Sequence, residues 1–596
     1  MAVNSFRNDE KTSMATKTET LLRLFSYLLK YTGAILGVLL IMGVTVTISV
    51  INPLIIEQAI DVYIKKKDFI GLMKLGVFGA AINITFVLFV KLRMYIMALI
   101  SNKILLEIRQ ELYVHIQTLS FQFFDSRPTG KILARIIGDV NSLKKVLSDS
   151  VTTLIPDFIS ICAVVVIMFL KDARLAAAAL SSTPIMVIGI WILEKKSHKR
   201  WQTFRKKGSN LNAYVHEDLA GMHVVQSLTA EEETKETFGD LVKQHRKSFV
   251  DAITYADMFG PIIDFCWGLG TMVLFYVGIV VLGTDKTSVG LLVAFGTYIS
   301  MFWSPVMNLS NFYNQLITNI TGAERIFEIM DTKADIKDKE NVVELPEIEG
   351  KVRFDKVSFT YDEGTPAETK VLKDVSFEIQ QGETIALVGP TGAGKSTIVN
   401  LISRFYDIQK GHIYVDGYDL QDISITSLRK QMGVMTQDNF LFSGTIEENI
   451  RYGKLEASKE EIIEAAKAVN AHKFIMQMEK GYDTELKERG AGLSIGQKQL
   501  IAFARTMVSK PKILILDEAT SSIDTKTELL VQKGIEILLK GRTSFVIAHR
   551  LSTIQKADRI FVIDEGGIIE QGSAKELLQK KGAYYNLYMA QFKDVC

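Results

Sequence analysis

The sequence predicts an α-helical membrane domain joined to an α/β domain. The chain has 596 residues, more than one hydrophobic core normally organises. Its mean hydropathy of +0.17 is high for a soluble protein, and the apolar surplus lies in the first 330 residues. From Lys351 onward, short β-type runs alternate with helix-forming stretches, which is typical of a largely parallel sheet covered by helices.

The first half contains six stretches that are long and apolar enough to cross a bilayer, which takes about 20 residues. They lie near 31–56, 75–100, 151–170, 175–193, 258–284 and 287–313. Long loops with amphipathic helical patterns alternate with short loops, so we expect the helices to continue beyond the lipid. The basic run EKKSHKRWQTFRKK after the fourth stretch places the long loops in the cytoplasm, although KKK at 65–67 in a short loop weakens this assignment.

Residues 1–30 form an N-terminal segment that we expect the mature chain to keep, because the first apolar stretch is too long for a signal peptide. One helical face of this segment carries Leu21, Leu24, Phe25 and Leu28. This face fits either a helix lying at the membrane interface or the first turn of the first span.

Composition excludes some other classes of protein. The cysteines, Cys162, Cys266 and Cys596, are scattered, which argues against a disulfide framework or a zinc site. A net charge of +2 gives no sign of a nucleic-acid partner. Asp157 and Asp264 fall inside predicted spans, where a charge is costly, and either a substrate or proton role or a structural contact is open for each.

The α/β half carries the run GPTGAGKST between the strand TIALV and a helix. The pattern G-x-x-x-x-G-K-[ST] is completed by Gly389, Gly394, Lys395 and Ser396. Its glycines let backbone N–H groups close on phosphate oxygens, Lys395 reaches the terminal phosphates and the Ser396 hydroxyl ligates magnesium. The sequence therefore predicts a nucleoside triphosphate site.

Further polar residues follow predicted strands. The strand ILIL ends in Asp517 and Glu518, which emerge at the edge of the sheet where ligands bind. Asp517 is placed to hold magnesium, and Glu518 to orient or deprotonate an attacking water. His549 ends the strand of TSFVIAH, where it could donate to a γ-phosphate, and Gln437 also follows a strand.

Together with LSIGQ at 493–497 and the SSID segment ending in Asp524, these motifs resemble the ATP-binding cassette (ABC) exporter family. The chain looks like a half-transporter of the type IV (also called type I) exporter fold, with six spans fused to one nucleotide-binding domain. It resembles in particular the catalytically competent subunit of bacterial heterodimeric multidrug-type exporters. The domains implied are an N-terminal segment at 1–30, a transmembrane domain at 31–324, a linker at 325–350 and a nucleotide-binding domain at 351–596.

The resemblance assigns roles residue by residue. Glu518 would be the catalytic base, His549 would contact the γ-phosphate and Gln437 would sense the metal and the water. Magnesium would be held by Ser396, Gln437 and Asp517, and Tyr361 would stack on adenine. The remaining contacts to ATP would come from Gly389, Thr391, Gly392, Gly394, Lys395, Thr397 and Asp524. Short coupling helices near 123–130 and 210–221 would dock on the nucleotide domains.

The signature would act on a partner chain. In this family ATP bound to one phosphate loop is covered by the signature of the other chain, here Ser494, Gly496 and Gln497. The family has a second glycine where Ile495 stands, so we expect lost backbone freedom, a side chain near the phosphate and a weaker site. An intact phosphate loop beside an altered signature predicts a heterodimer whose partner has a consensus signature and a degenerate Walker B motif. Lys487 stands where such exporters usually carry glycine, and this second departure also favours a heterodimer. The alternative is a homodimer that tolerates Ile495.

The expected function is ATP-driven export of a small amphipathic molecule, a lipid or a peptide across a bacterial cytoplasmic membrane, with the nucleotide domain in the cytoplasm. A regulatory subunit that uses ATP as a ligand, or an importer, is the alternative; the intact Glu518 and His549 and the order of the domains favour export. The residues that could line an apolar cavity, or simply face lipid, are Phe265, Trp267, Met272, Phe275, Phe302, Trp303 and Met307.

Overall fold

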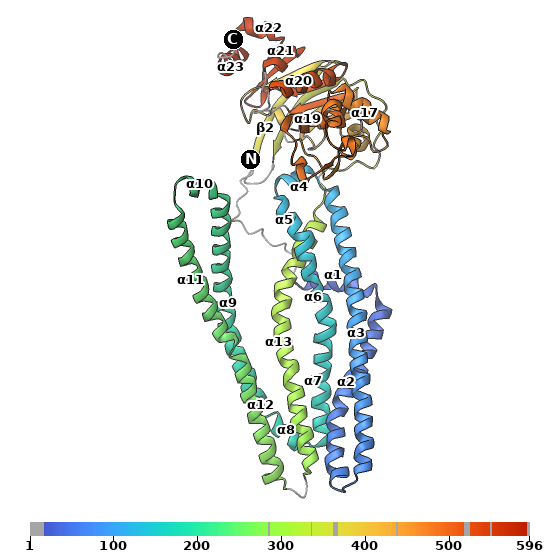
Figure 1. Ribbon diagram of the computed structural model, residues 1–596, viewed down its shortest axis with the longest axis vertical. Helices are drawn as coiled ribbons and strands as arrows, with labels where there is room; N and C mark the ends of the chain where they lie inside the picture. Colours follow the sequence, from blue (N-terminus) through green and yellow to red (C-terminus); the bar gives the residue numbers. More distant parts are fainter. Residues whose placement is uncertain are drawn as a thin grey trace. The chain divides into compact units, whose positions relative to one another are not determined.

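The computed structural model describes residues 17–283, 287–334, 336–361, 368–436, 439–517, 525–548 and 551–592 (Figure 1). Its contacts divide the chain into two compact units. The helical unit spans Asp9–Gln117 and Gly130–Asp331, and the α/β unit combines Thr332–Cys596 with the short segment Thr118–Thr129. A piece of the first long loop therefore belongs structurally to the α/β unit.

The helical unit consists of long helices, several of which continue through a π-helical turn. In chain order they are α1 (Lys17–Leu29), α2 (Thr32–Gln58) with η1 (Ala59–Ile64), α3 (Phe69–Thr118), α5 (Thr129–Ala134), η2 (Arg135–Asp139), α6 (Val140–Asp149), η3 (Ser150–Leu154), α7 (Ile155–Lys171), α8 (Ala173–Ala179), α9 (Thr183–Ala220), α10 (Met222–Ser227), α11 (Glu231–Ala256), α12 (Phe259–Tyr276), η4 (Val277–Val281) and α13 (Val289–Asp331).

Among the described residues, five helical runs are long and apolar enough to cross a membrane. They are Thr32–Ile64, Phe69–Thr118, Thr129–Lys171, Ala173–Ala220 and Glu231–Val281. A sixth, shorter apolar segment, Val289–Trp303, opens α13. The six expected spans thus coincide with these helices over their described residues, and the helices run past the apolar stretches as predicted. The last of them continues to Asp331, seven residues into the segment that we expected to be a linker from 325.

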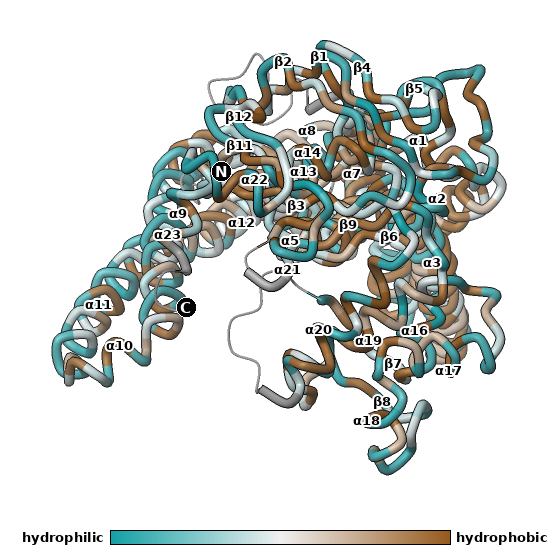
Figure 2. Tube along the Cα trace, turned by 90° about the horizontal axis from the view of Figure 1, so that it is seen from above, coloured by the Kyte–Doolittle hydropathy of each residue, from teal (hydrophilic) through white to brown (hydrophobic). Residues whose placement is uncertain are grey.

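The core of the helical unit lies where α7, α8, α12 and α13 meet. Phe295 and Tyr298 of α13 are fully buried there, and the Tyr298 hydroxyl donates to the backbone oxygen of Val50 at 2.7 Å, which ties α13 to α2. None of the side chains in the most apolar part of α3 is buried. Burial on α3 begins at Met97, near the end of the predicted apolar stretch at 75–100. Figure 2 shows many hydrophilic residues along α10 and α11, which extend past the apolar part of this unit.

The α/β unit contains two main sheets. The larger has the order β12-β11-β3-β10-β9-β6, in which β12 alone is antiparallel. Its strands are β3 (Thr384–Val388), β6 (Met432–Met435), β9 (Ile513–Asp517), β10 (Thr543–Ile547), β11 (Arg559–Asp564) and β12 (Gly567–Gly572). The central strands are buried on both faces, which explains their uninterrupted apolar sequences.

The second sheet is antiparallel, with the order β2-β1-β4-β5. Its strands are β1 (Val352–Tyr361), β2 (Thr369–Ile379), β4 (Lys410–Val415) and β5 (Tyr418–Asp419), and a small pair joins β7 (Gly444–Thr445) to β8 (Glu485–Leu486). The helices of this unit are α4 (Phe121–Asp125), α14 (Lys395–Ile402), α15 (Ile425–Arg429), α16 (Ile446–Arg451), α17 (Lys459–Ala468), α18 (His472–Met476), α19 (Ile495–Val508), α20 (Thr525–Leu539), α21 (Leu551–Lys556), α22 (Ala574–Lys580) and α23 (Ala583–Phe592); short 3₁₀ turns are η5 (Gly481–Asp483) and η6 (Glu488–Gly490).

Candidate functional site

The phosphate loop joins β3 to α14 in a conformation that needs its glycines. Gly389 has φ +148°, and a Cβ added there would stand 2.1 Å from the backbone oxygen of Ile563. Gly394 has φ +106° and caps α14 in the left-handed conformation. The loop therefore closes tightly against β11, and the free N–H groups at the start of α14 are available to an anion.

Lys395 lies inside this loop. Its Nζ donates to the backbone oxygens of Gly389 and Pro390, each at 2.8 Å, and the residue is only 9% exposed. Burial lowers the pKa of the Lys395 ammonium, and the negative charge of Asp517 partly offsets that effect. Two backbone oxygens are modest partners for a buried cation, so this group is well prepared to bind a phosphate.

The edge of the large sheet gathers the other predicted residues. β3, β10, β9 and β6 are adjacent and parallel, so their carboxyl ends lie along one edge. Asp517 ends β9, directly beside Ile547 of β10. The side chains of Ser396 and Thr391 are exposed at the loop end of the same edge. The predicted residues that lie outside the described part of the chain are Gln437, Glu518, Asp524 and His549.

An aromatic group connects the phosphate loop to the short helix α4. The Tyr361 hydroxyl lies 3.2 Å from the Thr397 hydroxyl, and the Tyr361 ring meets the Tyr406 ring edge to face at 5.1 Å. Tyr406 is 7% exposed, and its hydroxyl donates to the Asp125 carboxylate on α4. Tyr361 thus belongs to a continuous line of contacts from the phosphate loop to α4.

A second aromatic contact holds α4 in place. The Phe121 ring lies 4.9 Å from the Phe405 ring, and the Arg429 guanidinium lies over the Phe405 ring at 4.9 Å. Phe123 is buried, so α4 presents an apolar face as well as the Asp125 carboxylate. Sequence reasoning identified the α4 region but missed Phe405, Tyr406 and Arg429. No local motif marks them, because they pair with residues far away in the chain.

The two short loop helices differ in position from the prediction. The first is α4, Phe121–Asp125, which begins two residues before the expected 123–130. Residues 210–221 instead belong to the end of α9, and the chain turns at Gly221 into the short helix α10. The exposed apolar side chains around that turn are Leu219, Val224 and Leu228, at 65%, 59% and 70%.

The signature residues open α19. The Ser494 hydroxyl accepts from the Gln497 N–H at 3.2 Å, and the Gln497 side chain accepts from the Ser494 N–H at 2.9 Å, which is a capping box. Ile495 is the first helical residue, and it is absent from the residues with positive φ. The predicted loss of backbone freedom therefore causes no strain here. The Ile495 side chain itself is 51% exposed, next to the free N–H groups of Ile495 and Gly496.

The intramembrane residues fall into distinct groups. Asp264 is exposed, whereas Asp157 is half-buried. Of the residues proposed for a cavity, Phe302 and Trp303 are buried, and the Trp267 ring N–H donates to the Ser300 hydroxyl at 3.0 Å. Phe265 and Met272 are exposed at 67% and 74%, as expected of side chains that face lipid or another chain. Phe275 is 38% exposed, and the Met307 side chain lies outside the described part.

Comparison with known proteins identifies the family. Residues 34–306 match the family described as ABC transporter transmembrane region, and residues 372–521 match the family described as ABC transporter. An uncharacterised ABC transporter ATP-binding protein of Bacillus subtilis, YknV, is 41% identical over 96% of this chain and 94% of its own length. An ATP-dependent lipid A-core flippase of Syntrophus aciditrophicus is 39% identical over 84% of this chain and 82% of its own length.

Two further relatives agree. A putative multidrug export ATP-binding/permease protein of Staphylococcus aureus is 35% identical over 91% of this chain and 95% of its own length. The solved structure of a bacterial Atm1-family ABC exporter with ATP bound superimposes with a TM-score of 0.78 at 29% identity, covering 94% of this chain and 98% of that one. The chain belongs to the ABC transporter family, as an exporter half-transporter of the type IV fold whose ATP hydrolysis is coupled to transport.

Proposed function

We propose that this chain is the catalytically competent subunit of an asymmetric heterodimer that exports an amphipathic molecule. The observation that carries this proposal is Ile495, exposed at the start of α19 where the family has glycine. ABC half-transporters generally dimerise, and each signature faces the nucleotide bound by the other chain. A defect in this signature therefore weakens the site whose phosphate loop belongs to the partner.

The effect of Ile495 follows from the geometry of the helix start. The Gln497 N–H is already bonded to Ser494, so the N–H groups of Ile495 and Gly496 are left for a γ-phosphate. A branched side chain with 51% exposure stands beside them and hinders the approach of the phosphate. Losing one charge-assisted hydrogen bond weakens binding by about 1.5–3 kcal/mol, which is about 10- to 150-fold.

The site on this chain's own phosphate loop is intact. We assign the phosphates to Gly389, Thr391, Gly392, Gly394, Lys395 and Thr397, and the adenine to Tyr361. Magnesium fits the residues present, because Ser396 and Asp517 offer the oxygen ligands that this ion prefers. Together with Gln437 they would hold it, and its charge would polarise the γ-phosphate. Glu518 would act as the base, while His549 and Asp524 complete the contacts.

The short helices support a two-chain assembly. α4 packs on the α/β unit of its own chain through Phe121 and Asp125. α10 has no buried residue, and the apolar side chains around it are exposed. We assign it to the nucleotide-binding domain of the partner chain. Two such contacts for each chain would transmit closure of the nucleotide domains to the membrane helices.

The relatives support the class of substrate and the location. Their names include a lipid A-core flippase and putative multidrug export proteins, and a lipid is an amphipathic cargo. All of these relatives are bacterial, so we place the dimer in the cytoplasmic membrane with the nucleotide domains in the cytoplasm. The partner is a second half-transporter with a consensus signature and a degenerate Walker B motif.

The proposal is tested by measuring ATP turnover in lipid, with the chain alone and with a candidate partner encoded beside it. We expect turnover only when both chains are present, and its loss in Glu518→Gln of this chain. Robust turnover by this chain alone would show that Ile495 is tolerated in a homodimer. Turnover that persists in Glu518→Gln would overturn the assignment of the base.

A further inference from the structure

Three polar side chains meet within the membrane-spanning part of the helical unit. Arg93 lies on α3, Asp157 in the first turn of α7, and Asn308 on α13. The Asn308 side chain hydrogen-bonds the Asp157 carboxylate, and Arg93 is close enough to Asp157 for their charges to interact. Charges at this position are costly unless they are paired or bind something, so the cluster calls for a physical explanation.

The charges of this cluster are incompletely satisfied. The Nε of Arg93 and the Oδ2 of Asp157 are both buried, and neither has a hydrogen-bond partner among the described residues. In the described part of the chain, neither residue forms an ion pair. A purely structural ion pair would close the gap between the two groups. Here one donor and one acceptor are left for a third species.

The depth of the cluster can be estimated from the helix ends at the short loops. Asp157 lies 14 residues before the end of α7 at Lys171, and Asn308 lies 19 residues after the start of α13 at Val289. At 1.5 Å per residue, these positions are about 21 and 29 Å from those ends. The hydrocarbon core is about 30 Å thick, so the cluster lies in the half that is farther from the short loops, near the head groups of that leaflet.

The helices are also irregular next to the cluster. The π-helical turn η3, Ser150–Leu154, directly precedes α7, and Pro156 is buried beside Asp157. Pro305 interrupts the hydrogen bonding of α13 three residues before Asn308. Turns of this kind are often found at functional sites, because they open the helix and redirect side chains.

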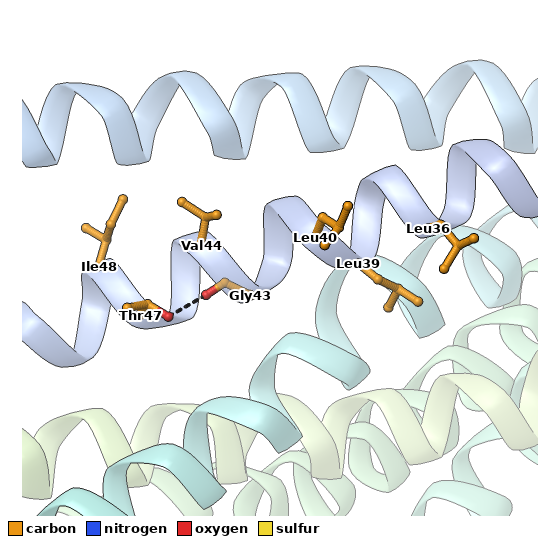
Figure 3. Close-up of a pocket in the computed structure, with 7 residues that line it drawn as sticks. All are labelled: Leu36, Leu39, Leu40, Gly43, Val44, Thr47 and Ile48. Carbon is orange, nitrogen blue, oxygen red and sulfur yellow. Dashed lines mark hydrogen bonds between the residues drawn. The ribbon is translucent and has the colours of Figure 1, made fainter.

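The hollow on α2 provides a contrast. It has a volume of about 540 Å³ and is lined by Leu36, Leu39, Leu40, Gly43, Val44, Thr47 and Ile48 (Figure 3). Its one hydroxyl, on Thr47, is already bonded to the Gly43 oxygen of the same helix at 2.8 Å. That surface offers nothing to a polar group and suits lipid chains. Other buried polar atoms without a partner in the described spans, such as the hydroxyls of Ser182 and Thr183, are neutral, whereas the Arg93 cluster offers a cationic donor and a carboxylate acceptor.

We propose that Arg93, Asp157 and Asn308 form the site that recognises a zwitterionic head group on the exported amphiphile. The anionic part of the head binds Arg93, and its ammonium donates to Asp157, which Asn308 holds in position. The apolar tail lies along the exposed part of α3, where Leu88, Leu92 and Met94 are 61%, 45% and 59% exposed. This inference rests on the proposed export of an amphiphile and names its class.

The test is direct binding to the full-length chain without ATP, which is independent of turnover and of the partner. Three probes with the same palmitoyl chain are compared: lysophosphatidylethanolamine, lysophosphatidylglycerol and monopalmitoylglycerol. The variants are Arg93→Gln and Asp157→Asn, with Arg93→Lys as a milder change. Lys91→Gln and Asp264→Asn are matched controls, because both residues are charged, exposed and within the same apolar region. Thermal unfolding checks that each variant folds.

Asp157→Asn and Arg93→Gln are expected to weaken the binding of different sets of probes. Asp157→Asn raises the Kd for lysophosphatidylethanolamine about tenfold, or about 1.4 kcal/mol, and leaves that for lysophosphatidylglycerol unchanged. Arg93→Gln raises the Kd for both lysophospholipids by about that amount, and neither variant changes the Kd for monopalmitoylglycerol. The controls change nothing. Equal losses for all three probes would identify a structural role and overturn the proposal, as would unchanged binding in both variants. Tighter binding of lysophosphatidylglycerol by Asp157→Asn would overturn it in favour of an anionic ligand.

Discussion

Replacing Tyr406 with phenylalanine tests how α4 communicates with the nucleotide site. The hydroxyl of Tyr406 donates directly to the Asp125 carboxylate of α4, whereas its ring contacts the Tyr361 ring at 5.1 Å. Tyr406→Phe removes the first contact and keeps the second. We therefore expect it to weaken the docking of α4 without changing how ATP is bound.

The size of the effect follows from the environment of the bond. A hydrogen bond to a charged group contributes about 1.5–3 kcal/mol. Tyr406 is 7% exposed, but Asp125 is exposed, so solvent reduces this to about 1 kcal/mol. The docked state of α4 should then lose about fivefold in population relative to undocked states.

The assay is ATP turnover of the reconstituted pair, with and without transported substrate. Tyr406→Phe should lower the stimulated rate several-fold and leave the basal rate and the KM for ATP unchanged. Asp125→Ala should have the same effect, and the double variant should add nothing, since each single variant removes the same hydrogen bond. Tyr406→Ala also removes the ring beneath Tyr361 and should raise the KM. If Tyr406→Phe raises the KM as much as Tyr406→Ala does, or leaves stimulation intact, the reasoning fails.

Three further predictions concern the phosphate loop and α10. Gly389→Ala places a Cβ against the Ile563 oxygen, so it should abolish ATP binding and destabilise the domain by more than about 2 kcal/mol. A Cβ at Gly392 would meet no atom within 4 Å, so Gly392→Ala should cost only about 1 kcal/mol, for its φ of +87°. Thermal unfolding measures the stability of both variants. Burial lowers the pKa of Lys395, and ATP binds the charged form of this side chain. ATP affinity should therefore fall as pH rises through the lowered pKa, at a lower pH than a free lysine would titrate. Binding titrations over pH should show that Lys395→Arg removes this loss of affinity. Val224→Asp on the exposed face of α10 should reduce stimulated turnover of the pair and leave the thermal stability of the single chain unchanged. A drop in that stability would instead place Val224 in the chain's own core.

Much of the fold could be predicted from sequence because its signals are local. The apolar stretches predicted the membrane helices, and the spacing of Gly389, Gly394 and Lys395 predicted the loop between β3 and α14. The docking of α4 could not be predicted in this way. Tyr406 and Asp125 are 281 positions apart, and no spacing rule connects them. The cluster of Arg93 and Asp157 could not be predicted either. The sequence shows the two charges, but it does not show that one buried atom of each lacks a hydrogen-bond partner.

Ile495 shows where a sequence argument needs the local conformation. The substitution of a glycine by a β-branched residue suggests backbone strain, but position 495 is the first residue of a helix, where isoleucine fits without a positive φ. What remains is a steric effect on an incoming phosphate. Such an effect acts on the partner's nucleotide and leaves the folding of this chain untouched. Ile495→Gly should therefore tighten ATP at the partner's site while gaining no stability, since it also exposes surface that the half-buried side chain now covers. A gain in both would show that strain at residue 495 had been present after all.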